Sequence, residues 1–112
     1  PAPLDPNFQG IGITTTNADG YYGFRTIIPA PYPLGFLDEG NDGWRAKHIH
    51  FKVTHPAAET LVTQMYFDGD PLLEHDGQIN QLSPEQKSLL ITKGIPVANT
   101  DLPLHQFDIV LA

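Results

Sequence analysis

Two histidines separated by one residue, His48 and His50, are the first candidates for chemistry in this sequence. Residues 48–54 alternate between polar and apolar types, as a half-buried β-strand does. In a strand, residues i and i+2 point to the same face with Cα atoms about 6.6–7 Å apart, so both imidazoles can reach one metal ion. The alternative is a solvent-facing polar surface, because histidine is also an ordinary surface residue.

A phenol, Tyr32, precedes His48 by sixteen residues and stands between Pro31 and Pro33. A tyrosine in such a rigid segment is often only a packing residue. A phenolate is nevertheless a hard anionic donor, and a trivalent cation lowers its proton affinity by direct Coulombic attraction. A site made of one tyrosine and two histidines would therefore prefer Fe(III).

Other metal sites fit these residues less well. Residues 38–43 imitate the start of a calcium loop, but Gly40 and Ile49 stand where oxygen ligands are needed. A zinc hydrolase, a ferrous facial triad or a cupin-type site would need a carboxylate close to the two histidines. The nearest acid downstream is Glu59, and Tyr32 would have no use in such sites.

Two polar residues near the histidines are further candidates. Arg45 lies three positions before His48, and Gln64 lies on the next predicted strand. Arg45 can instead form a surface ion pair with Asp42 or Asp38, and Gln64 can be an outward-facing residue of a half-buried strand. Residue type alone leaves both interpretations open.

The elements that would position these residues are mainly β-strands. Alternation and β-branched residues predict strands at 10–16 and 22–27, joined by a turn at 17–20, and further strands at 48–54, 61–67 and 105–111. Residues 29–33 are expected to be a stiff connector and 35–43 an exposed loop. A capping box at Ser83 begins one short helix near residues 84–93. The predicted fold is all-β, an antiparallel or mixed β-sandwich with this single helix.

Length and charge limit the function. The chain has 112 residues, six Lys and Arg, thirteen Asp and Glu and no cysteine, which predicts one acidic domain over residues 1–112. A net charge of −7 repels phosphates and anionic headgroups, and no apolar run reaches the length of a bilayer span. We therefore expect no nucleic-acid or membrane partner. The absence of cysteine favours a reducing compartment, and we expect a cytoplasmic protein.

Nearly the whole chain resembles the intradiol ring-cleavage dioxygenases, most of all the subunits of protocatechuate 3,4-dioxygenases. The matching segments are Leu4-Asp5-Pro6-Asn7-Phe8, Asp19-Gly20-Tyr21-Tyr22-Gly23-Phe24-Arg25-Thr26-Ile27, Pro31-Tyr32-Pro33, Trp44-Arg45-Ala46-Lys47-His48-Ile49-His50-Phe51, Thr63-Gln64-Met65-Tyr66-Phe67-Asp68-Gly69-Asp70-Pro71-Leu72 and Phe107-Asp108-Ile109-Val110-Leu111. The patterns Trp-Arg-x-x-His-Ile-His and Thr-Gln-x-Tyr-Phe at this spacing are specific. The Asp-Gly-Tyr-Tyr hairpin also occurs in other β-sandwich modules.

This resemblance implies that Tyr32, His48 and His50 bind a non-haem Fe(III), and that substrate displaces Tyr32. It implies that Arg45 and Gln64 lie beside the bound catechol, where Arg45 stabilises negative charge on the ring. The implied reaction is intradiol cleavage of a protocatechuate-like catechol with O2 to a cis,cis-muconate-type product, in aromatic compound catabolism. The implied partners are this aromatic diol, O2 and further subunits, identical or related.

The family pattern also has a second tyrosine ligand, upstream of the segment that begins at Leu4 and at a position that would precede Pro1. We therefore expect that the domain lacks an N-terminal segment that carries this ligand. The alternative is a non-catalytic module, transthyretin-like or carboxypeptidase-regulatory-like, or a dioxygenase-derived subunit without iron. The joint presence of the five candidate residues favours the enzyme.

Overall fold

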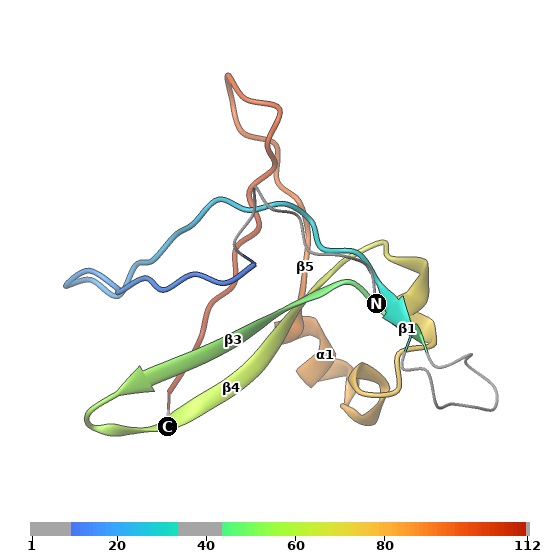
Figure 1. The fold of residues 1–112 in the computed structure, drawn as a ribbon, viewed down its shortest axis with the longest axis horizontal. Helices are drawn as coiled ribbons and strands as arrows, with labels where there is room; N and C mark the ends of the chain where they lie inside the picture. The colour runs from blue at the N-terminus through green and yellow to red at the C-terminus, as the bar shows by residue number, and fades with distance from the viewer. Residues whose placement is uncertain (1–9, 34–43, 112) are drawn as a thin grey trace.

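A long β-hairpin forms the centre of the structure, a computed structural model that describes residues 10–33 and 44–111 (Figure 1). Strands β3 (His48–His55) and β4 (Ala58–Phe67) pair antiparallel, with an irregularity in the register near the end of β3. The two strands predicted from the alternation at 48–54 and 61–67 are thereby confirmed.

Two short pairings extend this framework. β1 (Tyr32–Pro33) pairs antiparallel with β2 (Trp44–Arg45), just before β3 begins. β5 (Ile91–Thr92) lies parallel to the end of β4. The described residues therefore form a two-stranded sheet and a three-stranded mixed sheet in the order β3–β4–β5.

The chain between β4 and β5 is helical. Two 3₁₀ helices, η1 (Pro71–Glu74) and η2 (Ile79–Gln81), precede α1 (Pro84–Leu90). The predicted capping box is present, since the hydroxyl of Ser83 accepts from the backbone of Gln86 and the Gln86 side chain accepts from the backbone of Ser83. The helix ends earlier than expected because residues 91–92 pair with β4 instead. None of the described helices has the length and apolar character of a bilayer span.

Apolar side chains pack on both faces of β4, because successive residues of a strand point to opposite sides. One buried cluster consists of Met65, Phe67 and Phe107. The other consists of Ala46, Tyr66 and Ile79, with partly buried side chains from η1, α1 and β5 around it. Figure 1 shows these helical segments gathered at one end of the hairpin.

The hairpin predicted at residues 10–27 forms only its turn. The N–H of Gly20 donates to the carbonyl of Asn17, and the N–H of Asn17 donates to the carbonyl of Tyr21, where the chain reverses in a long excursion (Figure 1). No strand is assigned within residues 10–31. Ile11 and Ile13 are 80% and 97% exposed, so the apolar residues of the first predicted strand are left uncovered in the described chain. A two-stranded hairpin without a covered face is marginal in water.

The predicted strand at 105–111 keeps its alternation but is not assigned as a strand. Phe107 is buried, and its ring lies 5.0 Å from that of Phe51 in β3. The hydroxyl of Tyr22 donates to the carbonyl of Phe107. Both chain segments thus cover the apolar face of the hairpin through side chains. The described residues form a mostly β structure with an open mixed sheet and one α-helix, and the second sheet of the sandwich stays a prediction.

A buried ion pair connects β2 to the helical segment. The Nε of Arg45 donates to Oδ2 of Asp76 at 2.8 Å, and the two side chains are 3% and 0% exposed. The carboxylate also accepts from the backbone N–H groups of Ala46, Gln78 and Ile79. Burial by itself raises the pKa of Asp76, but the hydrogen bonds from Arg45, Ile79 and Ala46 outweigh it and hold the pKa below its ordinary value.

This ion pair predicts a specific dependence of stability on acid. A carboxyl with a lowered pKa contributes stability that is complete above its unfolded pKa of 3.8 and is lost as the pH falls through its folded pKa. Asp76→Asn should cost about 3–5 kcal/mol at neutral pH, because a buried guanidinium loses its carboxylate. It should also flatten the fall in stability below pH 3.8, as measured by urea unfolding across pH. Asp68→Asn, at an exposed carboxylate, is the control, and an equal effect of both changes would contradict the prediction.

Candidate metal centre

The register of the hairpin brings four polar side chains onto one face. His48 lies opposite Tyr66, and His50 lies opposite Gln64. Directly opposed residues of an antiparallel pair share a face, and so do residues two apart in one strand. His48, His50, Gln64 and Tyr66 therefore form a compact patch at the end of the hairpin nearest β2. The alternation predicted the faces within each strand, and the pairing register joins the two strands' faces.

The two imidazoles converge within this patch. Their Nε2 atoms are 3.2 Å apart, and the rings lie nearly perpendicular at 79°, with 4.8 Å between centroids. Imidazole nitrogens bind metal ions at about 2.0–2.1 Å, so two of them at right angles around one ion would be about 3 Å apart. The separation of the Nε2 atoms of His48 and His50 therefore fits two ligands of a single ion.

Hydrogen bonding prepares His48 to act as a ligand. Its Nδ1 lies 2.7 Å from the carbonyl oxygen of Ala46, and since a carbonyl only accepts, Nδ1 carries the proton. Burial lowers the pKa of His48, and the positive charges of Arg45 and His50 add to this, although the bond to Ala46 acts in the opposite direction. The neutral ring then presents the lone pair of Nε2 toward His50, the arrangement typical of metal-binding histidines.

Arg45 lies behind the patch. It is 2% exposed, so it is not the surface residue considered from the sequence, and its carboxylate partner is Asp76 rather than Asp42 or Asp38, which lie outside the described residues. Its Nη2 donates to Oε1 of Gln64 at 2.7 Å and to the hydroxyl of Tyr66 at 2.9 Å. The structure thus joins the sequence candidates Arg45 and Gln64 by a direct hydrogen bond.

The third predicted ligand is placed only by its backbone. Tyr32 pairs with Arg45 between β1 and β2, close in sequence to the start of β3. Its side chain lies outside the described part of the structure, as do residues 34–43. Within the described residues, no group of three or more His, Cys, Asp or Glu gathers around a common point, so the donors found there are the two histidines.

Two residues of the site were not among the sequence candidates. Tyr66 donates to Oε1 of Gln64 at 2.7 Å, and its ring centroid lies 5.7 Å from that of His48. The alternation of β4 already placed Tyr66 on the face of Gln64. For Asp76 the sequence signal is a turn. Its Oδ1 accepts from the backbone of Gln78 and Ile79, and the Asp-Gly sequence favours such a local turn. Its bond to Arg45 spans 31 residues and has no sequence signal.

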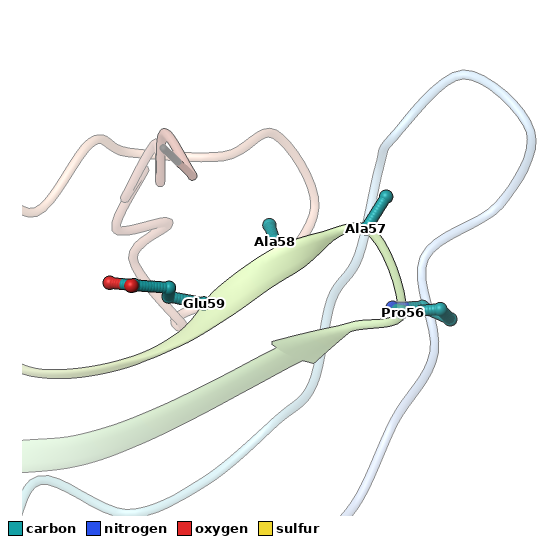
Figure 2. Close-up of a pocket in the computed structure, with 4 residues that line it drawn as sticks. All are labelled: Pro56, Ala57, Ala58 and Glu59. Atoms are coloured by element: carbon teal, nitrogen blue, oxygen red, sulfur yellow. The ribbon is translucent and has the colours of Figure 1, made fainter.

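A surface hollow at the other end of the hairpin is not part of this centre. It is lined by four consecutive residues, Pro56, Ala57, Ala58 and Glu59, at the turn between β3 and β4. In Figure 2 their side chains point in different directions, and the Glu59 carboxylate extends away from the turn. With His55 opposite Ala58 and His48 opposite Tyr66, the hollow and the histidine patch lie at opposite ends of the ladder.

Comparisons with known proteins agree on one family. The family model described as "Dioxygenase" matches residues 1–112. The protocatechuate 3,4-dioxygenase beta chain of Burkholderia cepacia is 45% identical over 114 residues, which cover 98% of this chain and 47% of that protein. A chlorocatechol 1,2-dioxygenase of Cupriavidus pinatubonensis is 41% identical over 73 residues, which cover 58% of this chain and 29% of that protein.

A solved structure shows the same fold. The 3-chlorocatechol 1,2-dioxygenase of Rhodococcus opacus 1CP superposes with a TM-score of 0.59 at 24% identity, over 80% of this chain and 37% of that one. The chain spans about half or less of the length of these relatives. The family match over the whole sequence and the identity to the beta chain support the same conclusion: the chain belongs to the intradiol ring-cleavage dioxygenase family.

Proposed function

We propose that this protein catalyses the intradiol cleavage of a protocatechuate-like catechol with O2, giving a cis,cis-muconate-type product. In this proposal Tyr32, His48 and His50 hold a non-haem Fe(III), and Arg45 and Gln64 lie beside the substrate. The convergence of the two imidazole Nε2 atoms at 3.2 Å carries the proposal. Family membership supports it, since relatives are named as protocatechuate, catechol and chlorocatechol dioxygenases.

Ferric iron, when bound, would supply the electron-deficient centre that binds the two catechol oxygens and makes the ring reactive toward O2. His48, fixed by Ala46, and His50 would hold the ion in one place throughout. Tyr32 would give up its position to the substrate. Arg45 would present a buried positive charge toward the negative charge that develops on the ring, and the surrounding protein would strengthen this attraction by excluding water.

Arg45 also orients the side-chain amide of Gln64. Its bond to Oε1 of Gln64 fixes the amide, which leaves Nε2 of Gln64 directed to Gln78 at 3.2 Å. One N–H of Gln64 is therefore used by Gln78, and the other N–H, not the amide oxygen, would be offered to a substrate. A group so oriented donates to an oxygen-bearing substrate.

We also infer that the working enzyme contains further subunits and acts in the cytoplasm. A relative that matches 98% of this chain is named a beta chain, which supports assembly with a related subunit. The absence of cysteine in the sequence fits a reducing compartment.

The first prediction from the proposed function concerns the two histidines. His48→Ala or His50→Ala should remove stoichiometric iron, because loss of a ligand exceeds the effect of outer-shell changes, which already cost about 10–100-fold in affinity. Metal analysis of the purified variants measures this. His55→Ala, on the same strand but exposed and outside the patch, should keep its iron. Full iron occupancy in either patch variant would show that the assignment is wrong.

A second prediction separates the charge of Arg45 from its shape. Arg45→Lys keeps a cation near Asp76 but loses the planar fork that reaches Gln64 and Tyr66. Turnover of the preferred catechol should fall about 10²–10³-fold, the usual effect of removing one preorganised donor, with iron content unchanged. Lys52 is exposed and lies on the histidine face of β3. Lys52→Gln should leave turnover unchanged. Unaltered turnover in Arg45→Lys would remove Arg45 from the reaction.

A third prediction concerns the second phenolate. Two neutral imidazoles and a displaceable Tyr32 give Fe(III) too few anionic donors during turnover. We expect the 112 residues alone to bind iron weakly and to cleave catechols poorly. A version extended upstream by the family's other tyrosine should be coloured by iron–phenolate absorption and active. Oxygen uptake and visible spectra of both, with equal ferric iron, test this, and equal activity would show that the upstream tyrosine is dispensable.

A further inference from the structure

The guanidinium of Arg45 makes different contacts through two of its nitrogens. The Nε side donates to Asp76 at 2.8 Å, whereas Nη2 donates to Gln64 at 2.7 Å and to Tyr66 at 2.9 Å. The group is planar and its donors form a rigid fork. Whatever fixes the Nε edge therefore fixes the direction of the whole cation relative to the histidine patch.

Asp76 is itself held firmly in place. Oδ2 accepts from the backbone of Ala46 at 2.9 Å as well as from Arg45, while Oδ1 accepts from Gln78 at 2.9 Å and from Ile79 at 3.1 Å. With four donors on two oxygens and a fully buried side chain, the carboxylate has no room to rotate. Asp76 therefore gives the Nε of Arg45 a partner that is held in place from several directions.

We propose that Asp76 is a positioning residue, which orients Arg45 toward the bound catechol and contributes to the reaction only through Arg45. This inference rests on the proposed function. The hydrogen bonds that Asp76 accepts from Arg45, Gln78 and Ile79 place it on the side of Arg45 that faces η2. Its part in the reaction is to fix the Nε edge and so aim the positive charge.

The chain contains a matched control in Asp70. Oδ2 of Asp70 accepts from the backbone of Lys47 at 2.8 Å, and Oδ1 accepts from Leu72 at 3.0 Å. Like Asp76, it ties the start of β3 to the helical segment through backbone hydrogen bonds. Unlike the hydrogen bonds of Asp76, these two come from backbone N–H groups and not from the guanidinium of Arg45. Asp70→Asn therefore reproduces the structural part of the change without the positioning part.

The test is a double-mutant cycle in the full-length protein. Iron-loaded protein is titrated with protocatechuate and with catechol in the absence of oxygen, and turnover is then measured with oxygen. Asp76→Asn should weaken catechol binding or lower turnover about 10–100-fold at unchanged iron content, the usual range for an outer-shell change. Asp70→Asn should stay within about 3-fold of the unmodified protein, because asparagine keeps an oxygen for the backbone donors and the change leaves the bond between Arg45 and Asp76 in place.

The same change in an Arg45→Gln background separates positioning from a general structural role. If Asp76 acts only through Arg45, Asp76→Asn has no further effect there. The double variant also has no lone buried charge, so it is expected to fold better than Asp76→Asn alone. If Asp76→Asn does not fold, Asp76→Glu, which keeps the charge but displaces the guanidinium, takes its place. An equal loss in both backgrounds, or a loss shared by Asp70→Asn, would overturn the proposal.

A spectroscopic measurement tests the same contact without activity. The Nε–H resonance of Arg45, recorded by NMR before iron is added, should be protected from exchange, and Asp76→Asn should shift it and speed its exchange, whereas Asp70→Asn should not. An unshifted resonance in Asp76→Asn would refute positioning whatever the reaction is. If the unmodified protein binds neither iron nor catechols, the proposed function fails, and a shifted resonance would then still support the contact between Asp76 and Arg45.

Discussion

The buried contact between Arg45 and Asp76 is the interaction on which the candidate site depends. It joins β2, the strand that leads into the histidine pair, to the helical segment after β4, and it also anchors the backbone at Ala46. The carbonyl of Ala46 in turn fixes the ring of His48. One carboxylate therefore accepts hydrogen bonds both from a buried cation and from the residue whose carbonyl lies against the imidazole of His48.

A buried ion pair of this kind is weak evidence for stability, because removing two charges from water offsets much of their attraction. The role of this ion pair is to orient the guanidinium of Arg45. The planar guanidinium donates through Nε to Asp76 and through Nη2 to Gln64 and Tyr66. Among the described residues, every buried polar side chain has a hydrogen-bond partner. Since the dielectric response is low inside the protein, the same cation also helps to keep His48 neutral.

The hairpin supplies the other requirement, which is a flat surface with a fixed spacing. Antiparallel pairing sets His48 beside Tyr66 and His50 beside Gln64, and a slip of one residue would turn the histidines to the apolar face occupied by Met65. The apolar contacts of Phe51 with Phe107 and with Tyr22 fix that register from the opposite side. The same strand register therefore places the candidate site on one face of the hairpin and the apolar cluster on the other.

The sequence by itself determined the features that depend on neighbours in the chain. The alternation in β3 and β4 predicted which side chains share a face, Ser83 and Gln86 predicted the start of α1, and the motif that contains Arg45, His48 and His50 indicated the family. Local preference was not enough at residues 10–27 and 105–111, where alternation is present but no assigned ladder forms, because a strand needs a partner that the local sequence does not specify. Only the tertiary structure decided that the partner of Arg45 is Asp76, since a hydrogen bond across 31 residues depends on how β2 and the helical segment pack and not on the types of the residues between them.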